Sequence, residues 1–209
     1  MPERESETST VPVVLAKFGF FRRDINDFLS RLVTMDETWL YRYDPETKQQ
    51  SMEWRHSGSP RPKKFRVQKS AGKVLALTFC GQDGILLIDY LPKDQTINAK
   101  YYSYLLVQLK DNLKEKCHGN ITKGIFSLQD NALAHRTVSN QKKLAYLGFQ
   151  CLDHPPYSLD MAPSEYYLFP GMKKQLKSRH FASDAEVIVA GETWLNGQIS
   201  EFFLSGLQN

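Results

Sequence analysis

The chain has 209 residues, 41% of them hydrophobic, and a formal net charge of +4 at pH 7. This length and apolar content are sufficient for one domain of ordinary size with a hydrophobic core. The net charge is too small to indicate a nucleic-acid partner by itself, so the position of the charges matters more than their sum.

The cysteines and the N-terminus exclude several classes of protein. Cys80, Cys117 and Cys151 are odd in number, lie far apart and form no Cys-x-x-Cys pair. This argues against a disulfide framework and a zinc site, and favours a reducing, intracellular compartment. The N-terminus is acidic and Lys17 interrupts the apolar stretch 11–21, so neither a signal peptide nor a membrane span is expected.

The first half of the chain predicts an antiparallel meander. Residues 1–30 show no clear periodicity and are expected to form a loosely ordered arm ahead of one domain over residues 31–209. Apolar runs predict three strands joined by short or basic connections: Leu32–Tyr43, Lys73–Cys80 and Gly84–Leu91, with a hairpin turn at residues 82–84.

The second half alternates helices with strands. Apolar residues at helical spacing predict a helix over residues 98–117, and a short apolar strand follows over 124–129. A helix over 137–146 that stops at Gly148 precedes another strand over 149–152.

Two serines mark the starts of the C-terminal helices. Ser164 is expected to cap a helix running to about His180, and Ser183 with Glu186 forms a capping box for a last helix. Three antiparallel strands, a helix and then alternating strands and helices describe an α/β (α+β) fold. We expect the ribonuclease-H-like arrangement, a mixed sheet flanked by helices.

Three carboxylates stand at informative places in this order. Asp36 interrupts an apolar strand, where an acid is costly unless it is paired or metal-bound. Asp130 ends the fourth strand and Glu165 opens a late helix, so the fold order would let all three converge. Carboxylate oxygens are ligands for Mg²⁺, and two ions about 4 Å apart can activate an attacking oxygen and stabilise a leaving one. The pattern therefore favours phosphodiester cleavage.

Each acid also has a purely structural explanation. Asp130 suits the N-cap of a following helix, and Glu165 in a first turn suits the helix dipole. Taken singly, both residues leave this explanation open. Asp36 is harder to explain in this way, and its neighbour Glu37 is expected to face the other side of the strand.

A basic stretch lies between the first two strands. From Trp54 to Gln82 there is no Asp or Glu, whereas seven cations occur there: Arg55, Arg61, Lys63, Lys64, Arg66, Lys69 and Lys73. Such a segment can neutralise phosphates and bind DNA in a salt-dependent way without reading its sequence. A solvated surface loop is the alternative. A second basic group on the late helix is assigned to solubility: Lys173, Lys174, Lys177 and Arg179.

Three segments carry motifs that occur together: Val33-Thr34-Met35-Asp36-Glu37-Thr38-Trp39, Gln129-Asp130-Asn131-Ala132 and Ala162-Pro163-Ser164-Glu165-Tyr166. With His154-Pro155-Pro156-Tyr157-Ser158 ahead of the third, they resemble the catalytic domain of the mariner transposases, in the Tc/mariner superfamily. The resemblance runs from about Asp27 to the C-terminus and is to transposon-derived copies in animal genomes.

The resemblance implies a DNA transposase or endonuclease of the DDE/D class. Asp36, Asp130 and Glu165 would be its catalytic residues and would hold two Mg²⁺ or Mn²⁺ ions, with no organic cofactor. Residues 54–73 would form the clamp loop that contacts DNA across a transposase homodimer. DNA cleavage and strand transfer by ancestry, residual endonuclease activity and a nuclear location follow as expectations.

Several positions depart from the family pattern. Gln129 stands where His is usual, Cys80-Gly81 replaces an aromatic-acid pair, and Glu165 stands where mariner enzymes have Asp. The family's N-terminal helix-turn-helix pair and its C-terminal segment are not in this sequence, so we expect neither specific recognition of transposon ends nor a secure dimer. A non-catalytic DNA-binding remnant and a vestigial product of a decayed transposon are the alternative interpretations.

Overall fold

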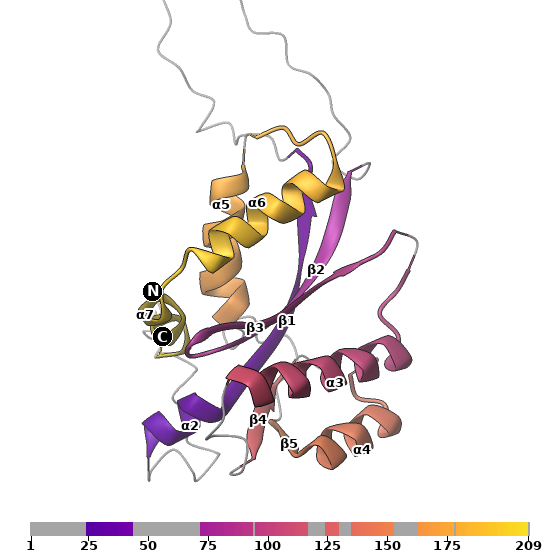
Figure 1. Cartoon of the computed structure of the whole chain (residues 1–209), viewed down its shortest axis with the longest axis vertical. Helices are drawn as coiled ribbons and strands as arrows, with labels where there is room; N and C mark the ends of the chain where they lie inside the picture. Colours follow the sequence, from indigo (N-terminus) through magenta and orange to yellow (C-terminus); the bar gives the residue numbers. More distant parts are fainter. Residues whose placement is uncertain are drawn as a thin grey trace, which may run out of the picture.

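The computed structural model describes seven parts of the chain: residues 24–43, 72–93, 95–116, 124–129, 135–152, 163–177 and 179–208. They form a five-stranded sheet with helices packed on it (Figure 1). The strands are β1 (Leu32–Tyr41), β2 (Lys73–Gly81), β3 (Gly84–Leu91), β4 (Ile125–Leu128) and β5 (Phe149–Leu152). The helices are α2 (Ile25–Arg31), α3 (Ala99–Lys116), α4 (Val138–Leu147), the π-helical turn η4 (Ser164–Leu168), α5 (Phe169–Leu176), α6 (Asp184–Asn196) and α7 (Ser200–Gln208).

The sheet is mixed, as the sequence predicts. Its strand order is β3-β2-β1-β4-β5. The β1–β2 and β2–β3 pairs are antiparallel, and β4 pairs in parallel with both β1 and β5. Each predicted strand agrees with the observed one to within two residues at either end. The ribonuclease-H-like arrangement is therefore confirmed, with β1 in the centre.

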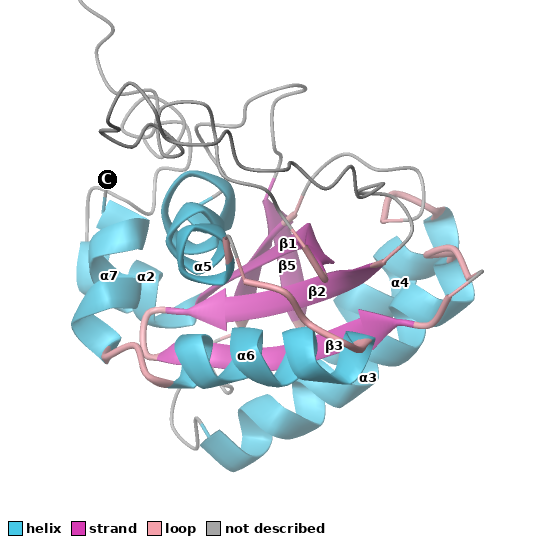
Figure 2. Ribbon diagram, turned by 90° about the horizontal axis from the view of Figure 1, so that it is seen from above, coloured by secondary structure: helices cyan, strands magenta, loops and turns pink. Residues whose placement is uncertain are grey.

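Alternate residues of β1 contribute to two different cores, because successive side chains of a strand point to opposite faces. Val33 and Met35 pack in the core that also contains the buried face of α3 and part of α4. Leu40 packs with Cys80 of β2 and with the buried residues of α5 and α6. Figure 2 shows α5 and α7 on one side of the strands and α3 and α4 on the other.

Local sequence signals explain how the first helices begin and end. The Asn98 side chain accepts a hydrogen bond from Tyr101 N at 2.9 Å at the start of α3. Thr137 caps α4 by accepting from Asn140 N at 3.3 Å. Gly148 ends α4 with φ of 81°, a left-handed conformation that glycine adopts without a steric cost.

The late helix differs from the prediction. Ser164 does not cap it: Ser164 is the first residue of η4, and its side chain is buried. Phe169 N donates to Ser164 O, which is the spacing of a π turn. The helix then ends at Leu176 rather than near His180. The predicted cap is wrong because the Ser164 hydroxyl lies against Cys80 of β2 instead of against its own helix start.

The predicted last helix is two helices. Ser183 Oγ accepts from Glu186 N at 3.2 Å, which confirms the predicted N-terminal cap of α6. The helix ends at Asn196, with Gly197 as its C-cap, and α7 follows after a break that the sequence pattern does not reveal. Within the described residues, none of the helices is long and apolar enough to cross a membrane.

The described part of the predicted N-terminal arm is a packed helix. In α2, Phe28 and Leu29 are buried, and Phe28 lies 5.1 Å from Phe126 between ring centroids. Arg31 Nε donates to Gly124 O at 2.8 Å, which joins α2 to the start of β4. Residues 24–30 therefore pack on the domain, and residues 1–23 lie outside the described residues.

An ion-pair network joins three elements at one end of the sheet. Asp184 at the start of α6 accepts from Arg42 Nε at 2.7 Å, and its second oxygen lies 3.2 Å from Lys93 Nζ. The hydrogen bond from Arg42 is the main reason that the pKa of Asp184 is lowered, with a further contribution from Lys93. The network connects the residues that follow β1 and β3 to α6.

The core prediction concerns Leu106, which is 0% exposed on α3. Leu106→Ala is expected to lower the free energy of unfolding by about 2–5 kcal/mol, because it removes buried methyl groups and leaves a cavity. Denaturant unfolding measures the change. Tyr104→Ala, at a 59% exposed position of the same helix, should stay within about 0.5 kcal/mol of the wild type.

The ion-pair prediction concerns pH. Because the pKa of Asp184 is below its ordinary value of 3.8, the ionised carboxylate stabilises the fold above that pH. This contribution is lost as pH falls through the lower pKa of the folded state. Asp184→Asn should therefore lower Tm at pH 6, and the difference from the wild type should shrink below about pH 4. Asp111→Asn, which breaks an exposed pair with Lys114, should change Tm little at either pH.

Candidate active site

Asp36 lies in the middle of β1, the central strand. Its backbone is in register with Thr78 of β2. Its Oδ1 atom accepts a hydrogen bond from Glu37 N at 2.8 Å, and its Oδ2 atom is buried. Since β1 is paired with β2 along most of its length and with β4 at its start, the backbone of Asp36 is held in place. The carboxylate of Asp36 therefore extends from a fixed backbone position on one face of the sheet.

Glu165 reaches the same region from the C-terminal part of the chain. It is the second residue of η4, which packs against β1. The preceding Ser164 has its Oγ 3.5 Å from the Sγ of Cys80, and this Sγ is also 3.5 Å from Thr34 Oγ1. Thr34 and Asp36 are two residues apart on β1 and so share a face. The structure thus brings the elements that carry Asp36 and Glu165 together on one face of the sheet.

Asp130, the remaining predicted acid, lies outside the described residues. The residue before it, Gln129, is buried and follows β4, whose last residue Leu128 is in register with Thr34 of β1. Gln129 Oε1 accepts a hydrogen bond from the Tyr102 hydroxyl of α3. The chain is therefore anchored beside β1 just ahead of Asp130, and the role of Asp130 stays a prediction.

Glu37 faces away from Asp36, as predicted. Its Oε1 lies 3.8 Å from Nε2 of His135, a buried residue on the α3 side of the sheet. The His135 ring packs on the Tyr102 ring with 4.4 Å between centroids. The two neighbouring acids of β1 thus belong to different environments, and only Asp36 is on the face that η4 covers.

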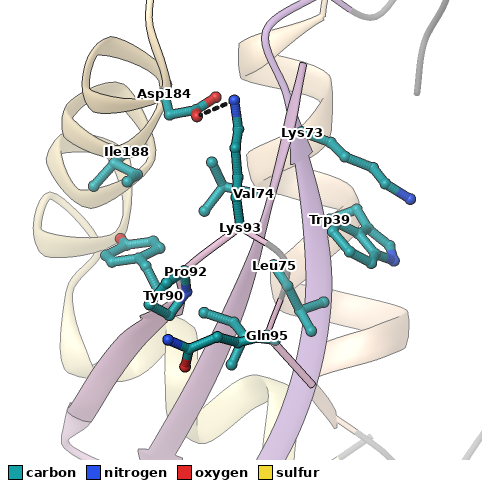
Figure 3. A pocket seen from close by; sticks show the side chains of 11 residues that line it. Trp39, Lys73, Val74, Leu75, Tyr90, Pro92, Lys93, Gln95, Asp184 and Ile188 are labelled. Carbon is teal, nitrogen blue, oxygen red and sulfur yellow. Dashed lines mark ion pairs between the residues drawn. The ribbon is translucent and has the colours of Figure 1, made fainter. Parts of the chain in front are cut away.

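Lys73 is the only one of the seven predicted DNA-binding cations among the described residues. The others lie outside them: Arg55, Arg61, Lys63, Lys64, Arg66 and Lys69. The Nζ of Lys73 lies 3.7 Å from the centroid of the exposed Trp39 ring. Both residues line a cavity of about 470 Å³ at the ends of β1 and β2, where Figure 3 shows Lys93 paired with Asp184. The cavity is therefore lined by the last residue of the predicted basic segment, Lys73.

Two of the three proposed ligands of a Mg²⁺ or Mn²⁺ site are among the described residues. No group of three or more His, Cys, Asp or Glu side chains in the described ranges could hold a metal ion. Asp36 and Glu165 nevertheless supply carboxylates, the oxygen ligands that Mg²⁺ and Mn²⁺ take. Burial raises the pKa of the Cys80 thiol, hydrogen bonding with Ser164 and Thr34 acts in the opposite direction, and the charge of Asp36 raises the pKa further. Cys80 is therefore a neutral thiol and not a thiolate ligand.

Sequence reasoning misses a cluster of three buried polar side chains, Thr34, Cys80 and Ser164, near the two acids. Thr34, Cys80 and Ser164 are not among the predicted site residues, although all three are buried on the same face. One signal does point to it, because Thr34 and Thr38 flank Asp36 at alternate positions and mark a polar face of the strand. The partner Ser164 cannot be found in this way, since it lies far away in the sequence.

Comparisons with known proteins relate the chain to DNA transposases. Residues 44–123 match a family model described as transposase (partial DDE domain). The chain is 27% identical over 207 residues to the Mariner Mos1 transposase of Drosophila mauritiana, covering 98% of this chain and 58% of that protein. It is 28% identical over 182 residues to the human histone-lysine N-methyltransferase SETMAR, covering 86% of this chain and 26% of that protein. The chain thus spans much less than the full length of either relative.

Solved structures agree with the sequence relatives. The crystal structure of the Mos1 mariner paired end complex with Mn has a TM-score of 0.83 and 27% identity, covering 100% of this chain and 61% of that one. The Mos1 catalytic domain has a TM-score of 0.73 and 24% identity, covering 100% and 91%, and shows the likeness of the fold. The chain is thus similar in sequence and in fold to the catalytic domain of the mariner transposases.

Proposed function

We propose that this chain binds DNA and cleaves phosphodiester bonds with divalent metal ions held by Asp36, Asp130 and Glu165. The observation that carries the proposal is the meeting of β1 with η4 on one face of the sheet, because these elements carry two of the three acids. The solved Mos1 structures include complexes with Mn and with Mg, and a paired-end complex with the left transposon end. We infer metal-dependent chemistry on DNA for this chain by analogy with those structures.

The main role of the protein side chains would be to hold the metal ions in position. Asp36 contributes a carboxylate fixed by a central strand, and Glu165 contributes one from a turn packed on that strand. Two Mg²⁺ or Mn²⁺ ions, when bound, would supply Lewis-acid activation of the attacking oxygen and of the scissile phosphate. The extra methylene of Glu165 relative to Asp matters because a misplacement of about 1 Å can cost roughly 100-fold in rate.

DNA is the proposed partner. Seven cations in residues 54–73, without an intervening acid, would neutralise phosphates and give affinity that depends on salt more than on sequence. A homodimer on paired DNA ends, strand transfer after cleavage and a nuclear location belong to the same proposal, by analogy with the paired-end and strand transfer complexes of Mos1.

The catalytic prediction is tested by nicking of supercoiled plasmid with Mg²⁺ or Mn²⁺, at low and at physiological salt. Asp36→Asn and Asp130→Ala should each reduce nicking by about 100-fold or more, because each removes a metal ligand. Glu165→Gln should have a similar effect, since it removes the carboxylate charge and keeps the length of the side chain. Glu37→Gln is the matched control: it alters the neighbouring acid on the opposite face and should retain most of the activity.

A folded wild type that shows no metal-dependent nicking would remove the catalytic proposal. If that protein still bound DNA, the non-catalytic remnant would be the better description. If it bound no DNA either, the vestigial interpretation would stand.

The DNA-binding prediction concerns the salt dependence of affinity. Replacing Arg61, Lys63, Lys64 and Arg66 together by Ala should weaken binding and lower the slope of log K against log salt by up to about 0.9 for each phosphate that is no longer neutralised. Fluorescence anisotropy with a random duplex measures both. The matched control replaces four other cations, Lys173, Lys174, Lys177 and Arg179, and should leave the slope close to that of the wild type. Equal slopes in all three proteins would contradict the proposed loop.

A further inference from the structure

Cys80 lies at a junction of three buried polar side chains. Its Sγ is 3.5 Å from Thr34 Oγ1 on β1 and 3.5 Å from Ser164 Oγ on η4, and Thr34 Oγ1 is 3.4 Å from the Cys80 carbonyl oxygen. Cys80, Thr34 and Ser164 are 6%, 3% and 1% exposed. Buried polar groups are costly unless they satisfy one another, so this cluster is a specific contact between β1, β2 and η4.

The junction connects the two described acids through the backbone. Thr34 precedes Asp36 by two residues on the same face of β1, and Ser164 directly precedes Glu165. The contacts span 46 and 84 residues of sequence, so they join parts of the chain that no local interaction connects. A movement of Ser164 away from Cys80 would carry Glu165 away from Asp36.

The sheet is also irregular at this point. In the β2–β3 pairing the register shifts between Phe79 and Cys80, and Leu86 of β3 is the extra residue. A β-bulge bends a strand and redirects its side chains, and bulges are frequent next to active sites. The bulge and the π turn of η4 meet at Cys80, where each departs from regular geometry.

We propose that Cys80 is a positioning residue whose thiol holds the turn carrying Glu165 against the strand carrying Asp36, and so sets the distance between the two metal-ligating carboxylates. The inference deepens the proposed function and rests on it. The thiol itself touches neither metal nor DNA. Its sulfur lies within hydrogen-bonding distance of two hydroxyl groups. A valine of similar size could not form these hydrogen bonds, and a serine could.

The test measures Mn²⁺ binding to the full chain by electron paramagnetic resonance, a readout that does not depend on nicking. Cys80→Val should raise the Kd for Mn²⁺ by about 10-fold, since supporting groups of a metal site typically contribute 10- to 100-fold to affinity. Cys80→Ser should restore binding to near the wild-type value. Thr193→Val, which removes an exposed hydroxyl of α6 that bonds only its own helix in the described contacts, is the matched control and should leave the Kd unchanged.

Ser164→Ala removes the other partner of the Cys80–Ser164 contact. It keeps the inference testable if Cys80→Val does not fold. It should also raise the Kd by about 10-fold, and Ser164→Ala combined with Cys80→Val should cost no more than either change alone. Far-ultraviolet circular dichroism identifies which variants are folded.

Three results would overturn the inference. In folded proteins, wild-type Mn²⁺ affinity in both Cys80→Val and Ser164→Ala would show that the contact does not position the acids. Equal losses in Cys80→Ser and Cys80→Val would show that the hydrogen bonds are not the cause. A wild type whose Mn²⁺ binding is absent, or is unaffected by Asp36→Asn, would remove the proposed function and this inference with it.

Discussion

The pairing of β1 in the middle of the sheet is the constraint on which the other features depend. Its register sets Asp36 beside Thr78 of β2, and Thr34 beside Leu128 of β4. Since the side chains of a strand alternate, a shift of one residue would turn Asp36 into the apolar core below α3 and bring Met35 to the other face. Such a buried carboxylate would be strongly unfavourable. The apolar residues of β1 therefore fix both the fold and the face on which the acid lies.

The two faces of β1 support different tasks. On the α3 face the sheet packs against a large cluster of apolar side chains, and Tyr102 of this cluster donates a hydrogen bond to Gln129. On the other face, Thr34, Cys80 and Ser164 interrupt the apolar packing of α5 and α6. A close-packed apolar face resists distortion, whereas hydrogen bonds fix the direction of approach of one element to another. The first face stabilises the domain, and the second defines where η4 meets the sheet.

The sequence predicts the elements whose signals are local. The strands and the end of α4 at Gly148 follow from residues within a few positions of the boundary. Ser164 is predicted as a cap because its residue type favours that role, but its hydroxyl uses a partner 84 residues away. Phe28 falls in the predicted loose arm because its burial depends on Phe126, which a local pattern cannot reveal. That the elements carrying Asp36 and Glu165 lie on one face of the sheet is predictable only through the order of the elements.

The position of Glu165 depends on interactions at both ends of η4. At its C-terminal end, Leu168 is buried in the core with α5, and the Tyr166 hydroxyl donates to Gly206 O of α7 at 2.5 Å. These contacts hold the turn to other helices, which themselves pack on the sheet. At its N-terminal end, Ser164 contacts the sheet directly. Glu165 is adjacent to Ser164, and Asp36 belongs to the sheet. The Ser164–Cys80 contact is therefore a short connection between the two acids, and small displacements of the helices affect it least.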